Sequence, residues 1–167
     1  MPALNDANML LNKHYNITIS IDGLQETIEE MLTAEETSPD EMLKMVNLAL
    51  QWSKYLDEAK SVVDYYLGFF EIKHSMIGAV KDEAKEDIRN DTRNSIPLAK
   101  KCKISEEEPE KILEASEWML KTSKAEIRIL KKYMNELNNY SKLMKAKYYS
   151  FGRKYRNSLR KVDKSEE

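Results

Sequence analysis

The sequence predicts an all-α protein in which two long helices, preceded by a short N-terminal helix, pair antiparallel and assemble with other copies. The chain has only four Gly and four Pro among 167 residues, too few for the turns of a many-stranded fold. Its charged fraction is 34% and its hydrophobic fraction 41%, a balance that favours narrow helical seams over a thick core. Apolar residues also recur at spacings of three and four over two long stretches.

The N-terminal region, residues 1–37, is predicted to form an arm and a short helix. Residues 1–14 are expected to be a frayed lead-in. The stretch "YNITISI" that follows alternates apolar and polar residues, which indicates a strand. With nothing to pair with, it is a packed extended arm, part of a helix, or a strand added to a partner. In "GLQETIEEMLTA", a short amphipathic helix is expected with one apolar face: Leu24, Ile28, Met31 and Leu32.

The first long helix is predicted over residues 38–90. Its start, "SPDE", combines a capping Ser38, Pro39 at the first helical position and Glu41 in a capping box. The positions that follow at spacings of three and four make a heptad seam that faces a partner helix. The residues of this first seam are Met42, Met45, Ala49, Trp52, Leu56, Ala59, Val63, Tyr66, Phe70, Ile77, Val80 and Ala84.

Residues 91–108 are predicted to be a connection, and residues 109–167 a second long helix with a basic tail. Gly152 is expected to loosen or end this helix. Within the first helix, Gly68 and Gly78 mark either a bend or a close approach of another helix. The second seam comprises Leu113, Leu120, Ile127, Leu130, Met134, Leu137, Met144, Tyr148, Phe151 and Tyr155, with Ser116, Ser123 and Ser141 at its weak positions.

Each long helix also carries a second apolar edge that a two-helix hairpin cannot cover. On the first helix this edge comprises Tyr55, Val62, Phe69 and Ile72; on the second it comprises Trp118, Ile129, Tyr133 and Tyr140. Uncovered apolar edges at helical spacing favour association with further helices. The sequence therefore predicts a homo-oligomer.

Catalytic and metal motifs are scarce, and we expect neither an enzyme nor a cofactor. Glu71 and His74 have the spacing of a di-iron ligand pair, but such a site needs a second motif, so a satisfied or exposed histidine is favoured. Cys102 lies between lysines, which is expected to lower its pKa somewhat. As the only cysteine it excludes an intramolecular disulfide. We see no signal peptide or apolar run of spanning length, which predicts a cytoplasmic protein without membrane contact.

Charge is strongly segregated along the chain. Residues 1–72 hold 13 acids and 4 bases, whereas residues 121–167 hold 5 acids and 14 bases. The stretch "KLMKAKYYSFGRKYRNSLRK" has eight Lys or Arg, four aromatic residues and no acid. Cations neutralise phosphates and exposed rings stack on unpaired bases. The predicted contacts to single-stranded DNA here are Lys142, Lys145, Lys147, Tyr149, Arg153, Lys154, Arg156, Arg160 and Lys161.

Other readings of this stretch stay open. Tyr148, Phe151 and Tyr155 fit the helix seam and are expected to be partly core, which leaves Tyr149 as the better stacking residue. The cations can instead form a solvated face, dock onto an acidic surface such as the acidic half of a neighbouring copy, or bind an anionic membrane. Single-stranded DNA is the favoured partner.

Two segments resemble a known family. The stretch "IDGLQETIEEML", followed by "NLALQWSKYLDEAK", resembles the phage UvsY type of recombination mediator, which carries an aromatic–Ser–Lys–aromatic–Leu stretch early in a long helix. Here that stretch is residues 52–56, "WSKYL". The final helix, with "KAKYYSFGRKYR", is loosely similar to the closing helix of the family.

The resemblance implies a ring-like helical oligomer that binds single-stranded DNA and helps a RecA-like recombinase displace single-strand-binding protein. The basic stretch of the family falls near "MIGAVKDEAK", where Gly78 and Val80 stand in place of basic residues. Either Lys73, Lys81 and Lys85 substitute from neighbouring turns, or the C-terminal basic run has replaced that contact. The alternative functions are a structural or adaptor coiled coil and a phage-encoded inhibitor of a protein partner.

Overall fold

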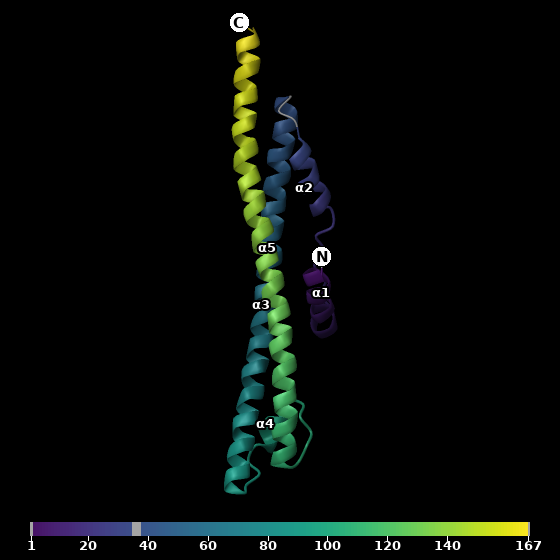
Figure 1. Cartoon of the computed structure of the whole chain (residues 1–167), viewed down its shortest axis with the longest axis vertical. Helices are drawn as coiled ribbons and strands as arrows, with labels where there is room; N and C mark the ends of the chain where they lie inside the picture. Colours follow the sequence, from purple (N-terminus) through teal and green to yellow (C-terminus); the bar gives the residue numbers. More distant parts are fainter. Residues whose placement is uncertain (1, 35–37, 167) are drawn as a thin grey trace. The chain divides into compact units, whose positions relative to one another are not determined.

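The computed structural model describes residues 2–34 and 38–166, and in this part of the chain the regular secondary structure is all α-helix (Figure 1). The predicted limits at residues 1, 37 and 167 lie outside it. The all-α prediction is confirmed, with no strand among the described residues. The helices are α1 (Pro2–Tyr15), α2 (Leu24–Thr33), α3 (Pro39–Asn90), α4 (Ile96–Lys101) and α5 (Pro109–Glu166).

The chain divides into two compact units, each built from segments that are distant in sequence. The first unit contains residues 2–14 and 63–133, and the second contains residues 15–34, 38–62 and 134–166. Each long helix therefore contributes one half to each unit.

In the first unit, the predicted frayed lead-in is wrong, because α1 is a packed helix. Ala3, Ala7 and Leu11 recur every fourth residue and are all buried. A face built mainly from alanine is a weak sequence signal, since alanine is small and is also common on the exposed faces of helices. His14, in the last turn of α1, has its Nε2 atom 3.3 Å from Glu126 and its ring edge-on to Phe70.

The connection between α3 and α5 in the first unit is more ordered than predicted. Residues 91–108 contain the short helix α4, which begins with Pro97 in its first turn, a position where the missing N–H needs no partner. The apolar side chains of this region form one small core with the neighbouring ends of α3 and α5. Its buried members are Val80, Ala84, Ala99, Ile104 and Ile112.

Asp87 organises the turn where α3 ends. Asp91 takes a left-handed conformation with φ 52°, and the backbone N–H of Thr92 donates to the carbonyl of Asp87 at 2.9 Å, as in a Schellman ending. The Asp87 carboxylate accepts two further bonds, from the Ser95 N–H at 2.7 Å and from the Thr92 hydroxyl at 2.9 Å. These three bonds connect the end of α3 to the start of α4.

In the second unit, the stretch around Ile17 is an extended arm, as one of the sequence alternatives proposed. Ile19 and Ile21 are buried, and the Tyr55 hydroxyl of α3 donates to the backbone carbonyl of Ser20. A backbone carbonyl of the arm thus has a hydrogen-bond partner without a second strand beside it.

In the second unit, α2 begins at Leu24 and α3 begins at Pro39. Ser38 caps α3 by accepting the Glu41 N–H at 3.2 Å. The apolar face of α2 is smaller than predicted: Leu24 and Met31 are buried, but Leu32 is 69% exposed. Leu32 follows Met31 directly and therefore points about 100° away from it around the helix, outside the packed face.

Most predicted seam residues are inside the protein. Ten of the twelve first-seam residues are buried, and Trp52 and Tyr66 are half-buried. The second seam is less covered, and its buried apolar members are Leu130, Leu137, Met144 and Phe151. Tyr133 was placed on an outer edge, but it is fully buried. A long Tyr side chain next to a seam can fold inward, which spacing alone does not reveal.

The helical glycines have open surroundings. An added Cβ at Gly68 or Gly78 would meet nothing within 4 Å, so no other helix of the described chain comes close at either glycine. The expected break at Gly152 is also wrong, because α5 continues through it to Glu166. One glycine costs about 1 kcal/mol of helix stability, which a long helix with a packed seam tolerates. No helix among residues 2–34 and 38–166 has the length and apolar character to cross a membrane.

Candidate nucleic-acid interface

The basic residues of α5 in the second unit form a stripe along one side of the helix. At about 100° per residue, spacings of three and four return to the same face. We call the residues on this face the primary basic stripe: Lys142, Lys145, Tyr149, Arg153, Arg156 and Arg160. All six are exposed. The stripe contains no acid, so a polyanion along it meets positive charge and one ring.

The other predicted cations of this segment lie on a different side of α5. Lys147, Lys154 and Lys161 are seven residues apart and fall more than a quarter turn away from the primary basic stripe. Lys147 and Lys154 are half-buried, and the Lys154 ammonium lies 5.2 Å from the ring centre of Phe151. Contact with a ring holds a cation close to the helix. The nine predicted contacts are thus not one surface.

Lys145 is already partly engaged. Its ammonium lies 3.1 Å from Asp57 of α3, and the same carboxylate accepts a 2.6 Å hydrogen bond from the buried hydroxyl of Ser141. That hydroxyl lowers the pKa of Asp57, and Lys145 adds to the effect. In contrast, Lys142 and the three arginines of the stripe take part in no ion pair within the described part of the chain.

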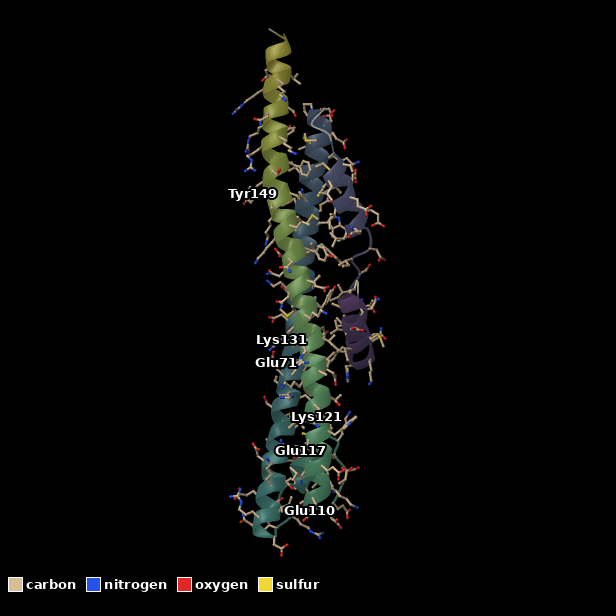
Figure 2. The ribbon with its side chains drawn as sticks, in the orientation of Figure 1. Glu71, Glu110, Glu117, Lys121, Lys131 and Tyr149 are labelled. Atoms are coloured by element: carbon tan, nitrogen blue, oxygen red, sulfur yellow. The ribbon has the colours of Figure 1, made fainter. Side chains whose placement is uncertain are left out.

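The aromatic residues of this segment differ in accessibility. Phe151 is buried and Tyr148 and Tyr155 are half-buried, which confirms their predicted seam positions. Tyr149 is 66% exposed and stands edge-on to Tyr148 with ring centres 5.4 Å apart. Figure 2 labels Tyr149 on the C-terminal part of α5. It is therefore the aromatic residue of the stripe with a face available to a base.

The three cations suggested by the family resemblance lie in the first unit, on α3. Lys73 and Lys85 are exposed and Lys81 is half-buried. Acidic residues flank Lys81 and Lys85, because the segment from residue 81 to 87 reads "KDEAKED". This mixed-charge surface attracts a polyanion less than the acid-free stripe does.

Two residues singled out for chemistry have structural surroundings. The Nδ1 atom of His74 lies 3.1 Å from the buried hydroxyl of Ser123, which confirms a satisfied histidine. For Cys102 the predicted direction is wrong: burial raises the pKa of its thiol, and Lys73 only partly opposes this. No group of three or more His, Cys, Asp or Glu among the described residues is arranged to hold a metal ion.

A second charged stripe on α5, in the first unit, was missed from the sequence. Four bases lie on one face at spacings of three and four, after three acids on the same face. In chain order the seven residues are Glu110, Glu114, Glu117, Lys121, Lys124, Arg128 and Lys131, and all are exposed. Figure 2 labels four of them along α5. Reading charges by helical spacing, rather than as an unbroken basic run, would have found it.

The comparisons with known proteins reveal no relative. No family model matches the chain, and no curated protein or solved structure is significantly similar to it.

Proposed function

We propose that the protein binds single-stranded DNA without sequence preference, through the primary basic stripe. The observation that supports this most is the combination of four unpaired cations and the exposed ring of Tyr149 in one acid-free stripe. Phosphate neutralisation with counterion release supplies affinity that does not depend on sequence. Stacking of a base on Tyr149 adds about 1–3 kcal/mol and requires an unpaired strand.

The test is a titration of a fluorescent oligo-dT followed by anisotropy at several salt concentrations. Four unpaired cations, at about −0.7 each for a single strand, predict that log K falls against log salt with a slope near −3. We expect the triple variant Arg153→Ala, Arg156→Ala, Arg160→Ala to bind at least tenfold more weakly, with unchanged helicity.

The matched control removes three charges from the other side of the same helix: Lys147→Ala, Lys154→Ala, Lys161→Ala. This control should lose clearly less affinity than the arginine variant. Equal losses of affinity in the two variants would show that binding does not depend on which side of α5 carries the charge. Binding that neither variant changes would exclude the C-terminal part of α5 and direct attention to Lys73, Lys81 and Lys85.

We further propose that α3 and α5 pair antiparallel within each unit. In the second unit, Asp57 contacts Ser141, and Lys60 donates to Asn138 at 3.0 Å. Moving forward along α3 thus moves the contact backward along α5. In the first unit, His74 contacts Ser123, and Val80 and Ala84, which lie later in α3, share a core with Ile112, which lies earlier in α5.

Association of several copies is the next part of the proposal. On α3 in the first unit, Tyr65, Phe69, Ile72 and Met76 follow heptad spacing, and their exposed fractions are 63%, 39%, 59% and 37%. A row of large apolar side chains in water is typical of an interaction site. Several copies on one strand would combine weak contacts into a strong one.

The finer role, recombination mediation, rests on the resemblance of the "QWSKYLDEAK" region to the UvsY type. In that role the bound strand is presented to a RecA-like recombinase while single-strand-binding protein is displaced. It is tested by filament assembly of a recombinase on strand coated with single-strand-binding protein. We expect faster assembly with this protein present and no gain with the triple arginine variant.

A structural coiled-coil or adaptor role is the second candidate, and the exposed apolar row on α3 favours it. A scaffold would assemble without oligonucleotide and show no salt-dependent binding to it. Mass measurement with and without oligo-dT separates the two functions.

A further inference from the structure

The charged stripe on α5 of the first unit is self-complementary. Three acids come first along the helix and four bases follow, all on one exposed face. None of the seven takes part in an ion pair or hydrogen bond within the part of the chain that the structure describes. From Glu110 to Lys131 the stripe runs about 30 Å along the helix, at about 1.5 Å per residue. A surface graded from negative to positive fits a copy of itself that runs the opposite way.

We infer that two copies of the chain pair antiparallel through this stripe, around a two-fold axis near residue 121. Such an arrangement sets six of the seven residues level with a residue of opposite charge in the other copy, and only Lys121, at the axis, meets its own counterpart. The pairs are Glu110 with Lys131, Glu114 with Arg128, and Glu117 with Lys124. Two-fold symmetry repeats each pair. A parallel arrangement would instead set acid against acid and base against base, so the charges select the antiparallel one.

Trp118 supplies apolar surface near the centre of this interface. It is 69% exposed and lies beside the stripe, three residues before the axis. In the antiparallel pair the two Trp118 side chains come to the same side, about 8 Å apart along the helices. Each Trp118 also lines a hollow of about 600 Å³ with Ile104, Glu114 and Met119 among others. Large aromatic residues near the centre of an interface often dominate its affinity.

A nucleic acid is the competing occupant of the same bases, and the acids argue against it. Glu110, Glu114 and Glu117 continue the face directly and repel a phosphate chain that follows the helix axis. The primary basic stripe is followed on its face by one acid, Asp163, rather than by three. The inference rests on the proposed self-association and adds an interface on α5 to the apolar row on α3; it does not require that the protein bind DNA.

Charge reversal tests the pairing. One variant carries Glu110→Lys, Glu114→Lys and Glu117→Lys, which makes the stripe entirely basic. The other carries Lys124→Glu, Arg128→Glu and Lys131→Glu, which leaves a single base in it. We expect each variant alone to dissociate at least tenfold more readily than the unmodified chain in sedimentation equilibrium without DNA. An equimolar mixture of the two should regain association, as should a chain with all six reversals.

The control variant reverses charges elsewhere in the first unit. Arg93→Glu, Lys100→Glu and Lys101→Glu change three exposed residues of the same unit outside the stripe and should leave the mass distribution unchanged. Circular dichroism verifies the helicity of every variant. A monomeric unmodified chain, or reversal variants that associate normally, would overturn the inference. So would a pattern in which the basic variant gains and the acidic variant loses oligonucleotide affinity at unchanged mass. Failure of the unmodified chain to bind oligo-dT would refute the proposed DNA binding alone.

Discussion

Replacing Asp87 by Ala tests whether one carboxylate holds the turn between α3 and α4. Its side chain is 4% exposed and accepts hydrogen bonds from the Ser95 N–H and the Thr92 hydroxyl. Hydrogen bonds to a charged group contribute about 1.5–3 kcal/mol each. Thr92 is only half-buried and can bond to water instead, whereas Ser95 is fully buried. We therefore expect Asp87→Ala to lower the free energy of unfolding by about 3 kcal/mol.

The assay is urea unfolding followed by far-ultraviolet circular dichroism, with Thr92→Ala as the partial control. Thr92→Ala removes only the hydroxyl bond and should cost about 1 kcal/mol. A loss below about 1 kcal/mol for Asp87→Ala would refute the reasoning, because it would mean that the Ser95 N–H finds another acceptor without difficulty.

The pH dependence of the unfolding free energy is a second test of the Asp87 carboxylate. Burial opposes its ionisation, but the hydrogen bonds from Ser95, Thr92 and Asn94 outweigh burial and lower the pKa of Asp87. A carboxylate with a lowered pKa stabilises the fold fully above its unfolded pKa of about 3.9 and loses this contribution as the pH falls through the folded pKa. The stability gap between the unmodified chain and Asp87→Asn should hence narrow below about pH 4. A gap that widens in acid would contradict the assignment.

Two substitutions are expected to stabilise the protein. Gly152→Ala should add about 0.5–1 kcal/mol in urea unfolding, because Gly152 is inside α5 and a Cβ there meets nothing within 4 Å. A loss of stability would indicate that another copy packs against this position. Asp91→Gly should raise the thermal midpoint modestly, because Asp91 has φ 52° and glycine takes this conformation without strain. An unchanged or lower midpoint would show that the Asp91 side chain contributes a compensating contact.

Helical periodicity made much of the fold predictable. The first seam was identified because residues such as Met45, Leu56 and Val63 repeat at a spacing that only a helix turns into one face. The Ser38 cap was predictable because its chemistry involves residues three positions apart. In the same way, the exposure of Tyr149 followed from its place outside the seam.

The failures have a common cause, which is dependence on neighbours distant in sequence. Helix α1 is weakly patterned and is held by contacts such as that of His14 with Glu126. The pKa of Cys102 is raised because its thiol is partly buried against a core that includes Val80 and Ala84 of α3, whereas the adjacent lysines had suggested the opposite. The basic run of α5 was read as one surface, but the helical turn divides it between two sides.

The amino-acid sequence by itself determined that this protein is helical, where its two long seams lie, and that its cations gather toward the C-terminal end. These properties depend on residues a few positions apart, whose geometry the helix fixes. Only the tertiary structure decided which cations remain unpaired, that Lys145 belongs to Asp57, and that Tyr133 is core while Trp118 is exposed. Such outcomes depend on which side chains the folded chain brings together, and a local pattern does not contain that information.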